Sequence, residues 1–555
     1  MKNVVKISIV LLGVFMFSSC LKDLEQFPMN DSTAKDVYKD LAGYKMALAK
    51  VYGAMVVTGN GSGGDVDGID EGSSDFLRCF FNHQELPTDE AHCLWQDPGI
   101  PEMNNMNFAP SCAFTIGLYG RSILQIMYAN DFMRNCTDAQ LDYNGITSAS
   151  DREEIKSFAA EARYIRAFQY WVLMDIFANP PFVTENSKFG ELPPQTNRKE
   201  LFAYVESELI ELGDGDLMKA PKGNEYGRVD RAAAWALLAR LYLNANVYLN
   251  EVGAPGNDAQ YYTKAITYAN KVINSGYSLR TDSYQNLFLN DNHLNNPEVI
   301  YSINYDGASS QGYGGTTFLI NCGSSSDYQD TYKSTLLHYG MIGNANWNGY
   351  RIRGEFINLF TSSDERYLFV GENQFMGDYT GNSVYGLQTY KYRNIASTMT
   401  EAEVDRILDA NEEAKSIVEV FGNDPLGVYA DNDYPLFRLA EMYLIYAEAV
   451  KRGGTGGSDA TALGYLNDLR DRAGLAAIAN YDLNYILDER GRELYWECQR
   501  RTDLVRYNKF TTADYIWEWK GGVKGGQAVS AHFNIYPIPN TDISANPNLK
   551  QNPGY

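Results

Sequence analysis

The chain has 555 residues, with 47 lysines and arginines against 70 aspartates and glutamates, and a net charge of −23 at neutral pH. This charge opposes binding to nucleic acid or to an anionic membrane surface, so those two kinds of partner are excluded first. The composition includes 41 tyrosines, a side chain with a flat apolar face and a hydroxyl that can stay hydrated. A neutral ligand such as a sugar suits this composition, although most of the tyrosines are expected to pack in the core.

The N-terminus has the pattern of a lipoprotein export signal. Lys2 and Lys6 precede an apolar run over residues 7–17, and the sequence Phe17-Ser18-Ser19-Cys20 follows as a cleavage box. The apolar run rises only about 16 Å as a helix, roughly half of a bilayer core, so it is too short to span a membrane. We predict a signal peptide over residues 1–19, lipidation of Cys20 as the first mature residue, and a polar tether over residues 20–35.

Helical periodicity dominates the rest of the chain. A first helix is predicted over residues 36–55, followed by a Gly/Asp-rich loop over residues 59–72, and the apolar spacing of residues 152–177 predicts a long amphipathic helix that ends at Pro180. A second group of helices is predicted over residues 232–249 and 260–273, and a third over residues 438–450, 460–472 and 483–501. Successive helix pairs indicate a mainly α chain with solenoid-like packing.

The region between residues 277 and 435 has a different composition. It is rich in Gly, Ser, Asn and Tyr, with short strand-like runs such as residues 298–304, and it keeps apolar residues throughout. This content indicates ordered loops rather than a linker, and long ordered loops on a rigid scaffold are where binding residues are expected.

Six segments along the chain are distinctive: EARYIRAFQYWVLMDIF (residues 161–177), RAAAWALLARLYLNA (231–245), YPLFRLAEMYLIYAEA (434–449), LNDLRDRAGL (466–475), ERGRELYWECQRRTDLVRY (489–507) and YPIPNTDISANPNLKQNPGY (536–555). In this order, and with a lipoprotein signal in front, they resemble the SusD/RagB family of outer-membrane glycan-binding lipoproteins. The resemblance implies a tetratricopeptide-like helical-pair scaffold that carries a loop-rich, mixed second subdomain. On that basis we expect the scaffold over residues 36–276, with a ligand-loop insertion over 59–115, the glycan-binding subdomain over 277–434, and the last part of the scaffold over 435–555. The family lies as a lid on a TonB-dependent outer-membrane transporter, which is the implied protein partner.

Three stretches, residues 67–95, 312–323 and 510–522, are similar to the starch-binding branch of that family. In that branch an arc of aromatic side chains cups a curved glucan, and polar side chains beside it bind hydroxyl groups. The resemblance assigns Trp95, Tyr313 and Trp347 to the arc and Asp70 and Arg78 to the polar contacts. The chain departs from the branch just after Trp95, where residues 96–99 lack the side-chain amide expected there.

The chemistry of these residues agrees with sugar binding, because an indole or phenol plane can cover the apolar face of a pyranose with little loss of rotamer entropy. We therefore expect an α-glucan, of starch or maltooligosaccharide type, to be bound without catalysis. A surface glycoside hydrolase is a competing hypothesis, since a pair of carboxylates among 70 acidic residues is enough for that reaction. The sequence is also compatible with a different glycan such as dextran, and with a purely protein-binding helical scaffold.

Two sets of charged residues are interpreted as structural. The sequence around Asp65, Asp67 and Asp70 lacks the glycine and the glutamate that an EF-hand loop requires. We predict no metal site and no cofactor. Acidic and basic residues alternate at helical spacing between positions 489 and 503, with no nucleophile or metal-binding group among them. We predict that they form ion pairs that pack helices together.

Overall fold

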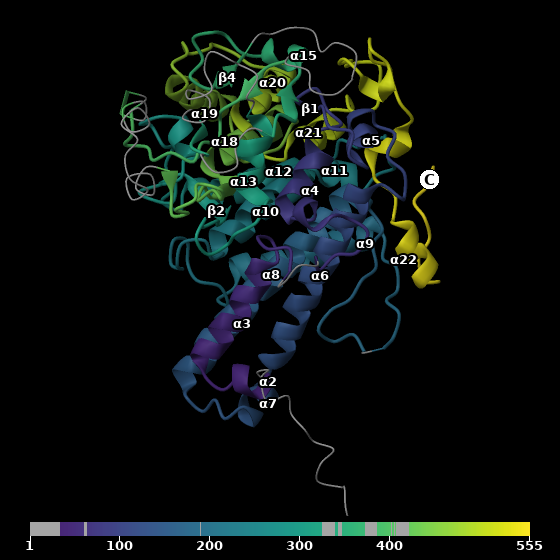
Figure 1. The fold of residues 1–555 in the computed structure, drawn as a ribbon, viewed down its shortest axis with the longest axis vertical. Helices are drawn as coiled ribbons and strands as arrows, with labels where there is room; N and C mark the ends of the chain where they lie inside the picture. Colours follow the sequence, from purple (N-terminus) through teal and green to yellow (C-terminus); the bar gives the residue numbers. More distant parts are fainter. Residues whose placement is uncertain are drawn as a thin grey trace, which may run out of the picture.

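The structure is a computed structural model of the chain, and it describes residues 34–59, 64–188, 190–324, 339–341, 347–371, 386–400, 402–403, 406 and 421–555. Figure 1 shows a broad upper part and a narrow lower part, which is formed by long helices that extend downward from the rest. Cys20 and nearly all of the predicted tether lie outside the described residues, so lipidation stays a prediction.

The described chain is mostly helical. Its α-helices are α2 (Ala34–Val37), α3 (Leu41–Gly53), α4 (Phe76–Gln84), α5 (Ile100–Asn104), α6 (Ala113–Asn135), α7 (Asp138–Tyr143), α8 (Ala149–Phe177), α9 (Arg198–Asp214), α10 (Arg231–Leu243), α11 (Ala245–Tyr248), α12 (Ala259–Ile273), α13 (Gly315–Gly323), α15 (Gly354–Ile357), α18 (Leu439–Lys451), α19 (Asp459–Arg472), α20 (Leu483–Leu494), α21 (Arg500–Arg506) and α22 (Asn540–Ala545). The strands are β1 (Ala91–Cys93), β2 (Val299–Ile303), β3 (Tyr350–Ile352), β4 (Phe369–Val370), β5 (Gln388–Thr389) and β6 (Tyr434–Arg438).

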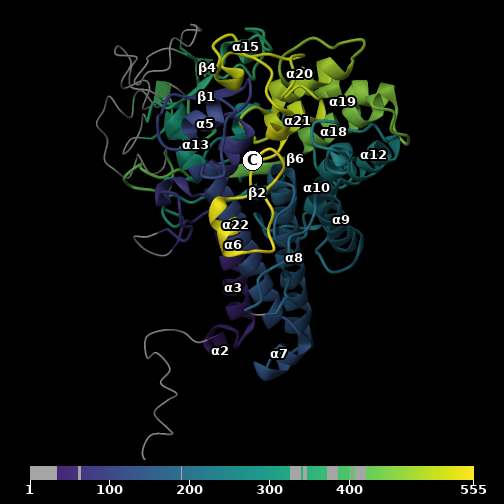
Figure 2. The same cartoon turned by 90° about the vertical axis from the view of Figure 1, so that its right-hand side faces the viewer.

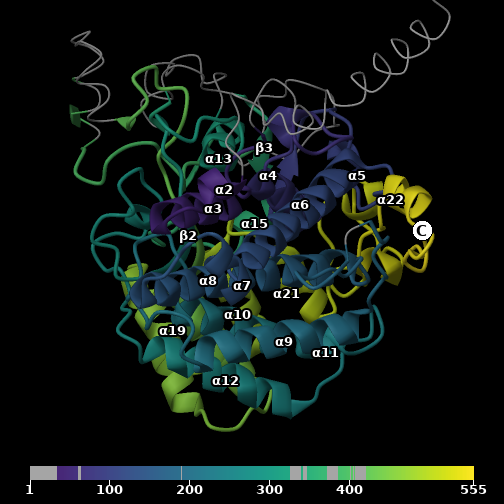
Figure 3. The same cartoon turned by 90° about the horizontal axis from the view of Figure 1, so that it is seen from below.

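The scaffold is a continuous stack of helices. Helix α6 packs on α8, α8 on α9, α9 on α10, α10 on α12, α12 on α18, and α18 on both α19 and α20. Seen from below, α6, α8, α9 and α12 follow one another across the molecule (Figure 3). Each helix buries one face on the helix before it and another on the helix after it, which is how a solenoid forms one extended core. The predicted helical-pair scaffold is confirmed.

Three of the predicted helices are interrupted. The first is divided into α2 and α3, because the Asp40 carboxylate accepts a hydrogen bond from the Gly43 amide and begins a new helix. The helix predicted over residues 232–249 ends at Leu243, and the short α11 follows.

The helix predicted over residues 483–501 is the clearest correction. It stops at Leu494, and α21 begins six residues later at Arg500. Between them Trp496 and Cys498 have positive φ angles of 60° and 58°, a conformation that breaks a helix. The buried carboxylates of Glu90 and Glu85 accept hydrogen bonds from the amides of Trp496 and Gln499, which are freed by the break. Tertiary contacts thus replace the helical hydrogen bonds at this point.

Sequence periodicity did not reveal helices α4, α6 and α9. All nine residues of α4 are buried, although it lies inside the predicted ligand-loop insertion, so this segment is part of the core as well as a carrier of loops. The polar side chains of α4, Arg78, Asn82, His83 and Gln84, are themselves buried, so its polar residues face other parts of the protein rather than solvent.

Short antiparallel strand pairs connect segments that are distant in sequence. Strand β1 pairs with β3, β2 with β6, and β4 with β5. The β2–β6 pair joins the loop-rich region to the start of α18, and it confirms the strand predicted over residues 298–304. The β1–β3 pair joins the residues that follow α4 to the middle of the loop-rich region. Among the helices of the described residues, none combines the length and the apolar character needed to cross a bilayer.

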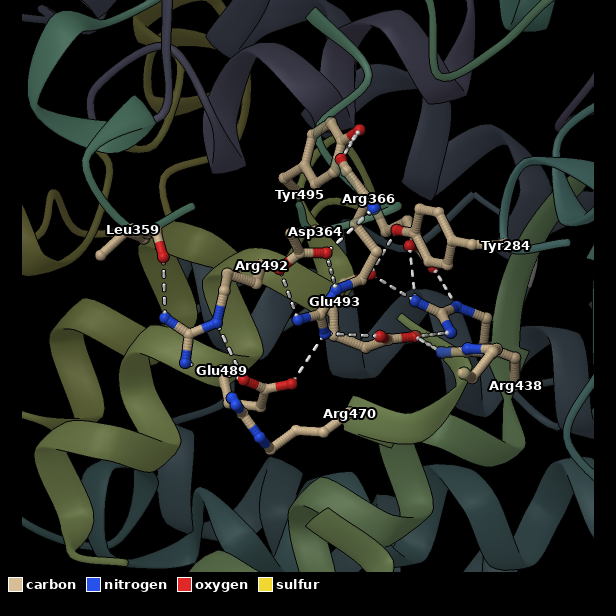
Figure 4. Close-up of polar contacts among 12 residues, drawn as sticks. Tyr284, Leu359, Asp364, Arg366, Arg438, Arg470, Glu489, Arg492, Glu493 and Tyr495 are labelled. Carbon is tan, nitrogen blue, oxygen red and sulfur yellow. Dashed lines mark hydrogen bonds and ion pairs between the residues drawn. The ribbon is translucent and has the colours of Figure 1, made fainter. Parts of the chain in front are cut away.

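The alternating charges near the C-terminus form a buried network of ion pairs (Figure 4). Glu493 on α20 contacts Arg366, Arg438 and Arg472, which come from three other segments, and its distance to Arg438 Nη1 is 2.6 Å. The prediction that these charges pack elements together is confirmed: Arg492 pairs with Glu489 one turn away, whereas the partners of Glu493 lie across the fold. We call the six residues Glu298, Arg366, Arg438, Arg472, Glu489 and Glu493 the buried ion network.

Candidate functional site

The two tryptophans assigned from the sequence lie together because of the β1–β3 pair. Cys93 is opposite Tyr350 in this pair, so Trp95, two residues after Cys93, lies beside the residues that precede Tyr350. The rings of Trp95 and Trp347 are 6.4 Å apart between centroids and tilted by 46°, and Trp95 Nε1 donates a hydrogen bond of 3.2 Å to the Trp347 carbonyl. Both side chains are half-buried, so each keeps part of its surface open to solvent.

Tyr313 extends this pair of rings at the turn before α13. Its ring centroid is 6.2 Å from that of Trp347, with the planes at 58°, and 46% of the residue is exposed. On its other side Tyr313 contacts Tyr429 at 5.6 Å. Burial raises the pKa of Tyr429, and its hydrogen bond with Tyr313 raises that pKa further. The structure therefore brings Trp95, Trp347 and Tyr313 into one continuous line of rings, which we call the aromatic row.

The backbone of the loop before β3 is held by the end of α13. The amides of Trp347, Asn348 and Gly349 donate to the carbonyls of Asn321, Ser324 and Cys322 at 3.1, 3.0 and 3.1 Å. Asn348 has a φ of 53°, the left-handed region that asparagine tolerates better than most residues. These bonds set the position of Trp347 through its main chain and leave its indole free to face outward.

Gly349 makes room for Trp95. A Cβ atom at this position would lie 2.3 Å from Cε2 of the indole, which is far inside contact distance. The Trp95 ring is supported from below by Tyr350, at 5.5 Å and nearly perpendicular. The indole therefore packs directly on the backbone of β3 and the residue before it.

Arg78 lies under the aromatic row rather than on its surface. It belongs to α4, is only 8% exposed, and holds its guanidinium 5.7 Å from the Trp95 ring and 4.8 Å from the Phe318 ring. Its Nη1 donates to the Gly72 carbonyl at 2.9 Å, while its Nε has no partner among the described residues. In this arrangement Arg78 supports Trp95 by a cation–π contact and ties it to the loop around Gly72.

Asp70 lies in that same loop, at one end of the aromatic row. It is exposed, directly precedes a short 3-10 turn (Glu71–Ser73), and lines a cavity of about 340 Å³ together with Asp97, Pro98 and Phe114. Because Asp97 is two residues from Trp95 and Phe114 contacts Arg78, this cavity adjoins the Trp95 end of the row. The site thus combines stacking surfaces in the row with carboxylates at one end.

Sequence reasoning missed Tyr429, Tyr350, Gly349 and Asp75. Asp75 Oδ1 accepts hydrogen bonds from the amides of Arg78 and Gly315, both at 2.9 Å. The paired glycines 314 and 315 were a usable signal, because such a pair permits close approach of the chain. Tyr429 gave no signal, since nothing in its local sequence distinguishes it from the rest of the 41 tyrosines.

Known proteins resemble this chain in sequence. The model of the SusD family matches residues 297–555. The starch-binding protein SusD of Bacteroides thetaiotaomicron is 34% identical over 574 aligned residues, which cover 97% of this chain and 96% of that protein. A SusD-like protein of Bacteroides ovatus is 25% identical and covers 72% of this chain and 70% of its own length.

Solved structures share the fold at lower identity. Surface glycan-binding protein A from Bacteroides uniformis has a TM-score of 0.66 and 22% identity, over 92% of this chain and 99% of its own. Surface glycan-binding protein A from Bacteroides thetaiotaomicron, in complex with laminarihexaose, has a TM-score of 0.65 and 19% identity, over 92% and 99%. The chain belongs to the SusD family, and its mostly helical architecture is that of the SusD superfamily.

Proposed function

We propose that this protein binds a glucan of the starch type at the cell surface, through the aromatic row, and delivers it to a TonB-dependent outer-membrane transporter. It does so without catalysis and is held on the outer membrane by lipid on Cys20. The loop-rich region over residues 277–434 supplies Tyr313 and Trp347 to the site, and the segment over residues 59–115 supplies Trp95, Asp70 and Arg78.

One observation carries the proposal: the three rings at the predicted positions form a continuous line, with spacings of 6.4 and 6.2 Å. The adjacent planes are tilted by 46° and 58°, so a ligand that covers all three rings has to bend along the row. A helical α-1,4-glucan bends in this way, whereas an extended β-1,4-glucan does not. Each ring contributes roughly 1 to 2 kcal/mol to binding, so the affinity is moderate and release to a transporter stays fast.

The laminarihexaose complex of a structural relative supports a wider set of candidates, because that relative binds a glucan of another linkage on the same fold. The second candidate is therefore the same surface with a different glucan. A hydrolase is a third candidate, which rests on the exposed carboxylates Asp70 and Asp97 beside the row.

The test uses the chain from Leu21 onward, which keeps every residue that the structure describes. Native gels are cast with amylopectin, dextran, laminarin, β-1,4-glucan or mannan, and the same mixtures are assayed for released reducing sugar. We expect retardation by amylopectin and no release of sugar. Retardation by another glucan alone overturns the starch assignment, and sugar release overturns the absence of catalysis.

Variants then test the site itself. Trp95→Ala combined with Trp347→Ala is expected to abolish retardation while the protein stays folded by circular dichroism. Trp235→Ala is the matched control, since Trp235 is also half-buried but lies on α10 with its Nε1 bonded to Asp214. A double variant that is folded and fully retarded shows that the aromatic row is not the binding surface.

A further inference from the structure

The aromatic row is built from two halves that belong to different helices. Trp95 rests on Arg78 of α4, whereas Tyr313 belongs to the turn that begins α13. The two halves are distant in sequence, so their relative position depends on tertiary contacts: the β1–β3 pair, the bonds between residues 347–349 and the end of α13, and a contact between the N-termini of α4 and α13. Helix α13 lies in the upper part of the molecule in Figure 2.

One carboxylate oxygen is hydrogen-bonded to both N-termini. Asp75 is the N-cap residue of α4, and its Oδ1 accepts from the Arg78 amide within its own helix and from the Gly315 amide, the first residue of α13. Helix α13 has no side-chain cap of its own, because Gly314 stands at its N-cap position. One negative charge therefore faces the positive ends of both helices, where an anion is favoured.

The chain around Asp75 is shaped to allow this approach. A Cβ atom on Gly314 would lie 2.2 Å from the Asp75 Cβ, and one on Gly315 would lie 2.2 Å from the Tyr305 ring. Gly315 also has a φ of 59°, which an L side chain rarely adopts. The turn directly after Tyr313 thus packs closely against Asp75, in a backbone conformation that requires glycine at positions 314 and 315.

Asp75 is nearly inaccessible, with 1% exposure, and its Oδ2 has no hydrogen-bond partner among the described residues. Burial raises the pKa of this carboxyl, and the two amide hydrogen bonds oppose that rise. Burying a carboxylate with one unpartnered oxygen lowers the stability of the fold. Asp75 is therefore expected to have a role in the structure that offsets this cost.

We infer that Asp75 is a positioning residue of the proposed glycan site: it fixes the turn of Tyr313 relative to Trp95 and so sets the shape of the aromatic row. This inference rests on the proposed function, because it concerns the same surface. Without the carboxylate, the Gly314–Gly315 turn loses its hydrogen bond to α4, while Thr316 and Thr317 still hold α13 to residues 432 and 430. The ligand contact at Tyr313 is then lost although the tyrosine is still present.

The first readout needs no ligand. Hydrogen exchange is followed in the peptide over residues 312–318, in wild type, Asp75→Ala and Asp75→Asn. We expect exchange at least about fivefold faster in Asp75→Ala, the effect of losing one buried hydrogen bond, and near wild-type exchange in Asp75→Asn, whose amide oxygen still accepts. Unchanged exchange in Asp75→Ala overturns the inference, whether or not any glycan binds.

The second readout is a double-mutant cycle on glucan affinity with Asp75→Ala and Tyr313→Ala. If Asp75 acts through Tyr313, Asp75→Ala weakens binding about fivefold in wild type and by less than about twofold once Tyr313 is already alanine. Equal losses in both backgrounds overturn the inference. The proposed function fails separately, when wild type binds no starch fragment or Tyr313→Ala binds as well as wild type.

Two further variants guard against a simple loss of stability. Asp230→Ala is the matched control, because Asp230 is also a buried N-cap carboxylate that accepts from several amides, but it lies at the start of α10. It is expected to lower stability and leave affinity unchanged. If Asp75→Ala does not fold, Gly314→Ala replaces it, since its new Cβ pushes the same turn away from Asp75 and is expected to weaken binding about fivefold. Wild-type affinity in folded Gly314→Ala overturns the inference.

Discussion

The aromatic row and the buried ion network are both dense clusters of functional-looking side chains, yet they are built in opposite ways. In the network every charged group meets partners of opposite sign and is cut off from water, as with Arg366, which contacts Asp364, Glu489 and Glu493. In the row each ring contacts its neighbour and keeps part of its surface open to solvent. Burial, rather than residue type, separates the part that holds the fold from the part that is available to a ligand.

The difference also concerns what a substitution removes. Removing one partner from a buried ion pair leaves an uncompensated charge, so the cost falls on folding. Removing one exposed ring from the row takes away a contact surface and leaves no buried charge unpaired, so the cost falls on binding. Substitutions in the two clusters therefore test whether the network serves folding and the row serves binding.

The largest effect is expected for Glu493→Ala. It leaves Arg366, Arg438 and Arg472 without a shared carboxylate inside the core, and we expect a loss of about 3 to 5 kcal/mol in the free energy of unfolding. The measurement is chemical denaturation followed by circular dichroism. Glu153→Ala, at an exposed position of α8, is the control and should change stability by less than about 0.5 kcal/mol. A loss below about 1 kcal/mol for Glu493→Ala would contradict the division.

The second-largest effect is expected at low pH, where protonation of buried carboxylates lowers the free energy of unfolding. Burial alone raises the pKa of Glu448, but Arg506 and Arg452 outweigh it and lower that pKa to about 2. A lowered carboxyl pKa means that the stabilisation is complete above the ordinary value near 4.5 and is lost as the pH falls toward 2. The shift corresponds to roughly 3 kcal/mol at neutral pH.

The pH effect is measured as the free energy of unfolding at pH 7, 5, 4 and 3, in wild type and in Glu448→Gln. We expect the difference between the two proteins to be largest at pH 7 and to shrink below pH 4.5. A difference that stays constant with pH would show that the Glu448 charge is not what these arginines stabilise.

A smaller effect, and one on binding alone, is expected for Tyr313→Ala. Tyr313 is 46% exposed and has one ring neighbour on either side, so its loss removes a stacking surface worth about a tenfold change in affinity. Titration calorimetry with maltoheptaose measures it, and denaturation should show a change in stability of less than about 1 kcal/mol. A large loss of stability with unchanged affinity would show that Tyr313 stabilises the fold and does not bind the ligand.

The smallest effects are expected for a pair of glycines. Gly349→Ala places a Cβ against the Trp95 indole, so we expect the ring to shift and the affinity to fall about threefold to fivefold. Gly464→Ala, at an exposed site of α19 with no neighbouring atom within 4 Å, should instead raise stability by about 0.5 to 1 kcal/mol and leave affinity unchanged. Equal affinities in the two variants would show that Gly349 does not set the position of Trp95.

Much of the architecture was predictable because it is local. The long helix α8 was predicted to within three residues at its start, and its end was predicted at Phe177, since its apolar spacing and its stop signal lie in one continuous segment. The helices of the last group were predicted equally well until Tyr495, where the main-chain bonds to Glu85 and Glu90 take over. These partners lie about four hundred residues away, so the end of the helix could not be predicted from the local sequence.

The site divides in the same way. The residue patterns predicted most of the long scaffold helices but not α4, α6 or α9, and they carried the resemblance to the SusD/RagB family and the three aromatic candidates for binding. Only the tertiary structure decided that β1 and β3 place Trp95 beside Trp347, that Arg78 lies beneath the ring, and that Asp75 ties the turn of Tyr313 to α4. The reason is physical: helix formation depends on residues a few positions apart, whereas the aromatic row depends on contacts between segments more than two hundred residues apart, whose relative position is set by packing.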